Sequence, residues 1–100
     1  MDSDFSMKIN LLDDYISKWR KVREGDVVNQ LFSETINFLK YCIRDLDAAQ
    51  KIECCVENVG SVYAIDGHIP PALKVVKEGA VEVICQILQG VKDAIAVPHL

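Results

Sequence analysis

The chain has 100 residues, half of them hydrophobic, with 11 basic and 15 acidic side chains and a net charge of −4 at pH 7. This length and composition predict one domain, residues 1–100, whose core is small relative to its surface. The acidic balance argues against general affinity for nucleic acid or an anionic membrane, and the absence of both a long apolar run and a basic leader favours a cytoplasmic protein.

The first predicted element is a helix over 4–22, because apolar residues recur there every three or four positions. Its apolar face contains Phe5, Ile9, Leu12, Ile16 and Trp19. Basic residues in its last turn oppose the negative end of the helix dipole, and Gly25 ends it.

A second helix is predicted over 26–46, with Asp26 as its N-cap. Tyr41 falls on the polar side of this helix, and exposed aromatic residues are enriched at interfaces. Asp47 and Gln50 then have the spacing of a capping box. We therefore expect a sharp turn, with the second and third helices as antiparallel neighbours.

The third predicted helix is central and covers 47–65, where the apolar residues again follow helical spacing. They are Ala48, Ile52, Cys55, Val59 and Val62. Its polar side carries Gln50, Cys54, Asn58 and Ser61, which we predict to be a partner-binding surface.

A loop is predicted at 66–70, followed by a short fourth helix over 72–78 that stops at Gly79. A fifth helix starts near Ala80 and carries Val83, Ile84, Ile87 and Val91 on one face, which we predict to be buried by a second copy or another protein. No strand pattern is apparent. The predicted fold class is therefore all-α, with four to five amphipathic helices.

The sequence also contains an approximate internal repeat. A shift of 45 residues places eight apolar residues between Val27 and Ile43 over eight apolar residues between Ala72 and Leu88. The domain then divides into an N-terminal capping helix (1–25), a helical hairpin unit (26–65) and an incomplete second helical unit (70–97).

Two passages resemble armadillo or HEAT repeats. They are VVKEGAVEVICQILQ at 75–89 and INFLKYCIRDLDAAQKIECCVENVG at 36–60, the latter with an asparagine, Asn58, late in its third helix. The resemblance implies a right-handed helical stack that binds proteins, with a compact helical bundle as the alternative. The chain departs from the family at Cys54, where peptide-binding members commonly have tryptophan, and at Glu34, which replaces a turn glycine.

Four cysteines lie within the predicted helical patterns, which favours buried thiols in a reducing compartment. They are Cys42, Cys54, Cys55 and Cys85. An alternative function is a metal- or thiol-dependent activity around His68 and these cysteines, although the spacing lacks the usual CxxC or HxxxH pattern.

A second alternative is a weak nucleic-acid contact through 18–23, where four basic residues surround Trp19. The predicted helix spreads these charges over more than half of its circumference, so they form no stripe. The sequence shows no catalytic or cofactor-binding motif. It therefore predicts a non-catalytic protein-interaction or oligomerisation module, in which apolar helix faces supply affinity and the polar side of the central helix supplies selectivity.

Overall fold

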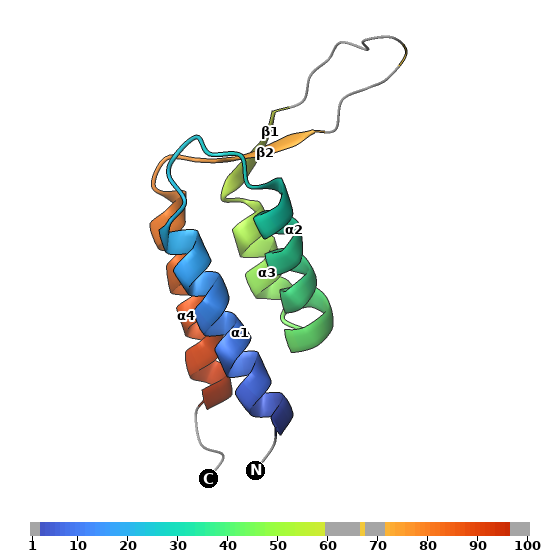
Figure 1. Cartoon of the computed structure of the whole chain (residues 1–100), viewed down its shortest axis with the longest axis vertical. Coiled ribbons are helices and arrows are strands. Elements are labelled where there is room, and N and C mark those ends of the chain that lie inside the picture. Colours follow the sequence, from blue (N-terminus) through green and yellow to red (C-terminus); the bar gives the residue numbers. More distant parts are fainter. Residues whose placement is uncertain (1–2, 60–66, 68–71, 97–100) are drawn as a thin grey trace.

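The computed structural model describes residues 3–59, 67 and 72–96. In this part, the chain is predominantly α-helical and includes a small antiparallel sheet (Figure 1). The elements in chain order are α1 (Ser3–Arg20), α2 (Asn29–Asn37), the π-helix η1 (Phe38–Ile43), α3 (Leu46–Glu53), the strands β1 (Val56–Val59) and β2 (Leu73–Val76), and α4 (Ala80–Ala96).

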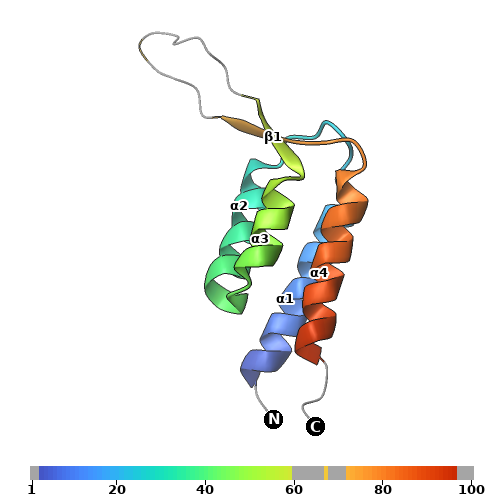
Figure 2. The same cartoon turned by 180° about the vertical axis from the view of Figure 1, so that it is seen from behind.

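The helices alternate in direction along the chain, and α1 packs against α4 while α2 and η1 pack against α3 (Figures 1 and 2). Contacts between α3 and α4 join the two pairs. The sheet lies at the end of the molecule opposite to the start of α1 and the end of α4. The first residues of α1 and the last residues of α4 are therefore far from the sheet.

The two longest helices agree with the sequence-based expectation. Helix α1 reproduces the helix predicted over 4–22, and α4 begins at Ala80 as expected and continues through Gly90. Their facing sides are buried and belong to one core. The core residues of this pair include Leu12, Ile16, Trp19, Ile84, Leu88 and Val91. Between the same helices, Lys92 Nζ lies 2.6 Å from an Asp13 carboxylate oxygen.

The second helix begins later than predicted and changes type along its length. Its N-cap is Val28 and not Asp26, because the Asp26 carboxylate accepts a hydrogen bond from the Arg23 N–H at 2.8 Å. After Asn37 the helix widens into η1, whose C-cap, Arg44, is in the left-handed conformation with φ 64°. The Asp45 N–H then bonds the Leu39 carbonyl at 2.9 Å, which closes this end.

Helix α3 is capped by Asp45 rather than by Asp47. The Asp45 side chain accepts a hydrogen bond from the Ala48 N–H at 2.9 Å, whereas Asp47 lies in the first turn and pairs with Lys51 at 3.0 Å. Since only Arg44 separates the end of η1 from Asp45, this aspartate directly precedes α3 and is placed to cap it. The predicted antiparallel arrangement of the second and third helices is confirmed (Figure 1).

The predicted central helix over 47–65 is wrong over 54–59, and its last part, 60–65, lies outside the described residues. The chain turns at residues 54–55 and enters β1, which pairs with β2 in the register Val56↔Val76 to Val59↔Leu73. The predicted short helix over 72–78 is therefore also wrong, because its residues form β2. Gly79, with φ 73°, makes the turn before α4.

Within residues 3–59 and 72–96, no helix is both long and apolar enough to cross a lipid bilayer. The predicted loop at 66–70 lies outside the described residues except for Gly67.

Candidate functional site

Strand β2 is held on both sides. On one side it pairs with β1, and on the other it pairs with the segment that leads into α2 through the bridge Val27↔Val75. The Val28 N–H donates to the Lys74 carbonyl at 2.9 Å, and the Val76 N–H donates to the Asp26 carbonyl at 3.2 Å. The sheet is thereby attached to the start of α2.

The side chain of Asn29 extends this pairing by one more position. Its Oδ1 accepts a hydrogen bond from the Lys74 N–H at 2.6 Å, and its Nδ2 donates to the Ala72 carbonyl at 3.1 Å. The amide thus supplies one acceptor and one donor, as the backbone of a neighbouring strand would. Because Asn29 is also the first residue of α2, it fixes the helix start against β2.

The pairing places four aliphatic residues on the same side of the sheet. Directly opposite residues of antiparallel strands point to the same face, and alternate residues of one strand do so too. The pairs Val59↔Leu73 and Val27↔Val75 therefore share one face, which we call the outer sheet face. Glu57, opposite Val75, lies on this face as well.

The outer sheet face is exposed, whereas the opposite face is packed on the helices. Val27, Val59 and Leu73 are 56%, 48% and 40% exposed, and Val75 is half-buried. On the other face, Val56 and Val76 belong to the core. Exposed aliphatic side chains are ordinary when scattered, but a contiguous group of them is typical of a binding surface.

The predicted partner-binding residues do not form one helix face. Gln50 lies on α3, Cys54 lies in the following turn, and both are exposed. Asn58 lies on β1, opposite Lys74 and therefore on the face that contains Val56 and Val76. Its Oδ1 accepts a hydrogen bond from Lys74 Nζ. Ser61 lies outside the described residues.

Tyr41 is exposed, as its place on the polar side of the second helix predicted, but it lies on η1. The ribbon that continues α2 into η1 runs away from the sheet (Figure 1). The face predicted for oligomer contacts is mostly covered by the chain itself. Ile84 and Val91 are buried in the core, because α1 packs along α4, and Ile87 is partly buried. Of these four residues, only Val83 is exposed.

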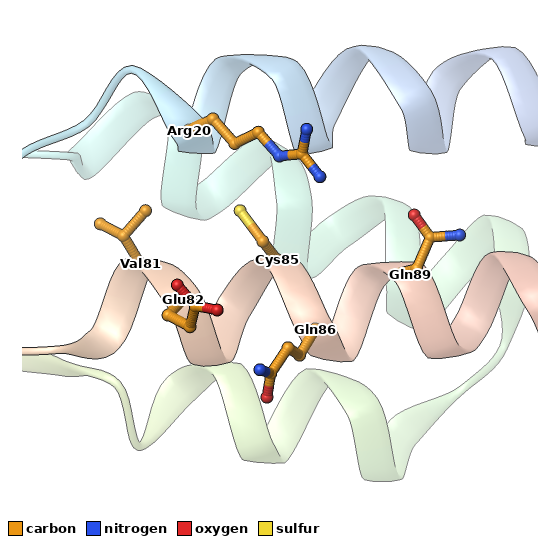
Figure 3. Close-up of a pocket in the computed structure, with 6 residues that line it drawn as sticks. All are labelled: Arg20, Val81, Glu82, Cys85, Gln86 and Gln89. Atoms are coloured by element: carbon orange, nitrogen blue, oxygen red, sulfur yellow. The ribbon is translucent and has the colours of Figure 1, made fainter.

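A second candidate site is an open groove of about 630 Å³ between α1 and α4 (Figure 3). It is lined by Arg20, Val81, Glu82, Cys85, Gln86 and Gln89. The Cys85 sulfur points toward α1, from which the Arg20 side chain extends along the groove. Burial raises the pKa of the Cys85 thiol, and the nearby Arg20 lowers it by less. The thiol is therefore protonated at neutral pH, which does not favour a nucleophile.

The four cysteines are free thiols, as predicted, but they are not all buried. Cys55 is buried and its thiol donates to the Lys51 carbonyl at 3.4 Å, whereas Cys54 beside it is exposed. His68 lies outside the described residues. Among the residues that are described, no three His, Cys, Asp or Glu side chains are grouped in a way that would hold a metal ion.

The basic residues and the tryptophan at 18–23 do not form one exposed surface. Trp19 is fully buried, so its ring is not available to stack on a nucleic-acid base. Lys18 pairs with Asp14 at 3.1 Å, and Arg20 borders the groove. The exposed basic side chains therefore lack the aromatic partner that the sequence suggested.

The outer sheet face was not found by sequence reasoning, because Val59 and Leu73 were assigned to helices. One local signal was present, namely the density of valine in 56–59 and 73–76, since β-branched residues favour strands. The helical spacing of the same residues concealed it.

The approximate 45-residue repeat is matched by the structure in its second part only. Residues 36–43 and 81–88 are helical in both copies, whereas Leu73–Val76 is a strand and the corresponding positions, 28–31, are the N-cap and first residues of α2. The resemblance to armadillo or HEAT repeats stays a prediction. The chain matches no protein-family model, no curated protein and no solved structure.

Proposed function

We propose that the protein is a non-catalytic protein-interaction module that docks a partner on the outer sheet face. The observation that carries this proposal is the side-by-side exposure of Val27, Val59 and Leu73. Covering apolar surface is favourable by about 25 cal/mol per Å². These residues lie on a sheet that is hydrogen-bonded to the start of α2, so little order has to be gained on binding.

The size of this surface bears on the kind of partner. A stable interface between two proteins buries about 1,200–2,000 Å² in total. Four partly exposed aliphatic side chains supply only part of that area. A second copy docked face to face on these residues alone would therefore bind weakly, which favours a partner that gains further affinity from neighbouring groups.

The arrangement of the helices supports a compact bundle rather than a helical stack. Helix α4 returns along α1, and the ion pair between Asp13 and Lys92 joins them. The first and last helices therefore cover each other, whereas the end units of a stack remain apart. In this form the bundle is the support and the sheet is the contact surface.

The proposal is tested by replacing Val27 and Leu73 with threonine, which keeps β propensity and removes apolar surface. Val83→Thr is the matched control, because Val83 is similarly exposed, at 44%, but lies on α4. Partner proteins retained by the immobilised wild-type chain are quantified by mass spectrometry, and mass in solution is measured by light scattering. We expect the double variant to lose a partner, or a larger oligomer, that the control retains. Equal retention by all three chains would contradict the proposal.

A further inference from the structure

We propose that the partner is an extended peptide segment that adds as a strand to the free edge of β1 and carries a basic residue opposite Glu57. This inference rests on the proposed function and names its mode of binding. In strand addition, main-chain hydrogen bonds supply affinity and alternate side chains supply selectivity. The mode therefore meets the need for affinity beyond the small outer sheet face.

The backbone of β1 has groups available for such a strand. Lys74 uses its carbonyl for Val28 and its N–H for Asn29, both on the side of β2 away from β1. Its cross-strand partner Asn58 thus receives no backbone bond from it. In antiparallel sheets, the N–H and C=O of such a residue point to the other edge of the strand.

Val56 repeats this pattern two residues earlier. Its partner Val76 uses its N–H for the Asp26 carbonyl and its carbonyl for the Gly25 N–H at 3.1 Å. The backbone groups of Val56 and Asn58 therefore share the free edge, and no described residue is hydrogen-bonded to them through the backbone. An unpaired edge of this kind is a template for another strand.

The side chains along this edge define the chemistry of the segment. Glu57 and Val59 lie on the outer sheet face, on either side of Asn58. Glu57 is exposed and forms no ion pair within the described residues. An added antiparallel strand is favoured by Lys or Arg opposite Glu57 and by a β-branched residue opposite Val59. The net charge of −4 also attracts a basic segment.

A second copy of β1 fits this edge less well. A two-fold pair of β1 strands that uses these backbone groups has its axis either at residue 57, where residue 56 faces residue 58, or at residue 58, where that residue faces its own copy. The first register places two Glu57 carboxylates directly opposite each other, which is unfavourable. The second places Glu57 opposite Val59 twice and gains no charge pair. A basic segment gains both a charge pair with Glu57 and an apolar contact with Val59.

The probe is a fluorescein-labelled peptide, acetyl-Thr-Val-Lys-Val-Thr-Val-Thr-amide, compared with the same peptide bearing Glu in place of Lys. We expect the Lys peptide to bind the full chain by fluorescence anisotropy and the Glu peptide to bind at least tenfold more weakly. Glu57→Lys should reverse this preference. On binding, hydrogen exchange of the Asn58 amide, followed by NMR, should slow at least tenfold.

The decisive variant is Asn58→Pro, which removes an edge N–H that the β1–β2 ladder does not use. Asn58→Ala is its matched control, because it loses the same side chain but keeps the N–H. We expect the proline variant to bind the Lys peptide at least tenfold more weakly than the alanine variant. The Val75 amide, on the paired side of β2, should exchange equally slowly in both if the ladder is intact.

Two outcomes would overturn strand addition. One is binding of the Lys peptide by Asn58→Pro and Asn58→Ala with equal affinity, and the other is no binding of the Lys peptide to the wild-type chain at about 1 mM peptide. Neither outcome decides the proposed function, which is tested separately by partner loss in the Val27 and Leu73 double variant. If the double variant loses partners but the wild-type chain does not bind the peptide, the outer sheet face remains the proposed docking surface and strand addition is rejected.

Discussion

The indole Nε1 of Trp19 donates a hydrogen bond of 2.9 Å to the Thr35 hydroxyl, and both residues are fully buried. The hydroxyl in turn donates to the Leu31 carbonyl at 2.7 Å. Thr35 is the one polar residue among the buried residues of the described part. The pair joins α1 to α2 in one orientation, because a rotated α1 would leave the indole N–H without a partner.

Replacing Thr35 with valine should therefore destabilise the chain. Valine has nearly the same shape but leaves the indole N–H of Trp19 buried and unpaired, which costs about 1–3 kcal/mol. Urea unfolding followed by circular dichroism measures the change. In a Trp19→Phe background there is no indole to leave unpaired, so the same substitution should cost less. An equal loss in both backgrounds would show that the hydrogen bond contributes nothing specific.

The N-cap of α3 gives a second prediction. Asp45→Ala should lower the free energy of unfolding by about 1 kcal/mol, because the Ala48 N–H loses its acceptor. Asp47→Ala is the matched control and should cost about 0.5 kcal/mol or less, since it removes only an exposed i,i+4 ion pair with Lys51. If the two costs were reversed, Asp47 would be the functional cap in solution.

Arg44 gives a third prediction, because it adopts a left-handed conformation with φ 64°. A side chain with a Cβ atom pays about 1 kcal/mol there, and β-branched residues pay more. Arg44→Gly should raise the free energy of unfolding by up to about 1 kcal/mol, and Arg44→Val should lower it. Thermal unfolding of the two variants measures the difference. Equal midpoints would be inconsistent with a left-handed residue after η1.

The cysteines differ in expected reactivity. At pH 8, iodoacetamide should modify exposed Cys54 before half-buried Cys85, whose pKa lies above the ordinary value of 9.0 because of burial. The thiolate becomes the main form only above that pKa, so the rate at Cys85 should continue to rise beyond pH 9. Site-resolved mass spectrometry follows each thiol. Faster modification of Cys85 at pH 8 would contradict the structure.

Arg20 provides the control for this measurement. It lowers the pKa of Cys85, so Arg20→Gln should move the pH midpoint of Cys85 modification upward, with the rate at exposed Cys54 as the internal reference. A change in access alone would alter the rate at every pH without moving the midpoint. An unchanged midpoint would show that the guanidinium does not act on the thiol.

The long helices could be predicted from the sequence because their structure is set by neighbours three and four residues away. Leu12, Ile16 and Trp19 define one face of α1, and Ile84, Leu88 and Val91 define one face of α4, so periodicity was sufficient. Helix ends were less predictable. The second helix changes to a π-helix and ends at Ile43, earlier than predicted, so the next helix also begins earlier and is capped by Asp45 rather than by Asp47.

The sheet could not be predicted from local spacing. Cys55 and Val59 continue the helical pattern of α3, yet β1 forms because β2, 14 residues after the end of β1 and thus distant in sequence, supplies its partner. Such pairing depends on non-local contacts, which a window of neighbouring residues does not contain. The same holds for the candidate site. The exposure of Tyr41 could be predicted from helical spacing, whereas the outer sheet face depends on non-local strand pairing and could not.

The sheet lies at one end of the bundle, and the start of α1 and the end of α4 lie at the other. The bundle therefore separates the sheet from these two helix ends. Helix α1 has 18 residues, which correspond to a length of about 27 Å. The start of α1 is therefore separated from the sheet by at least about the length of this helix. Tethering the protein by one end should therefore leave its contact surface facing outward.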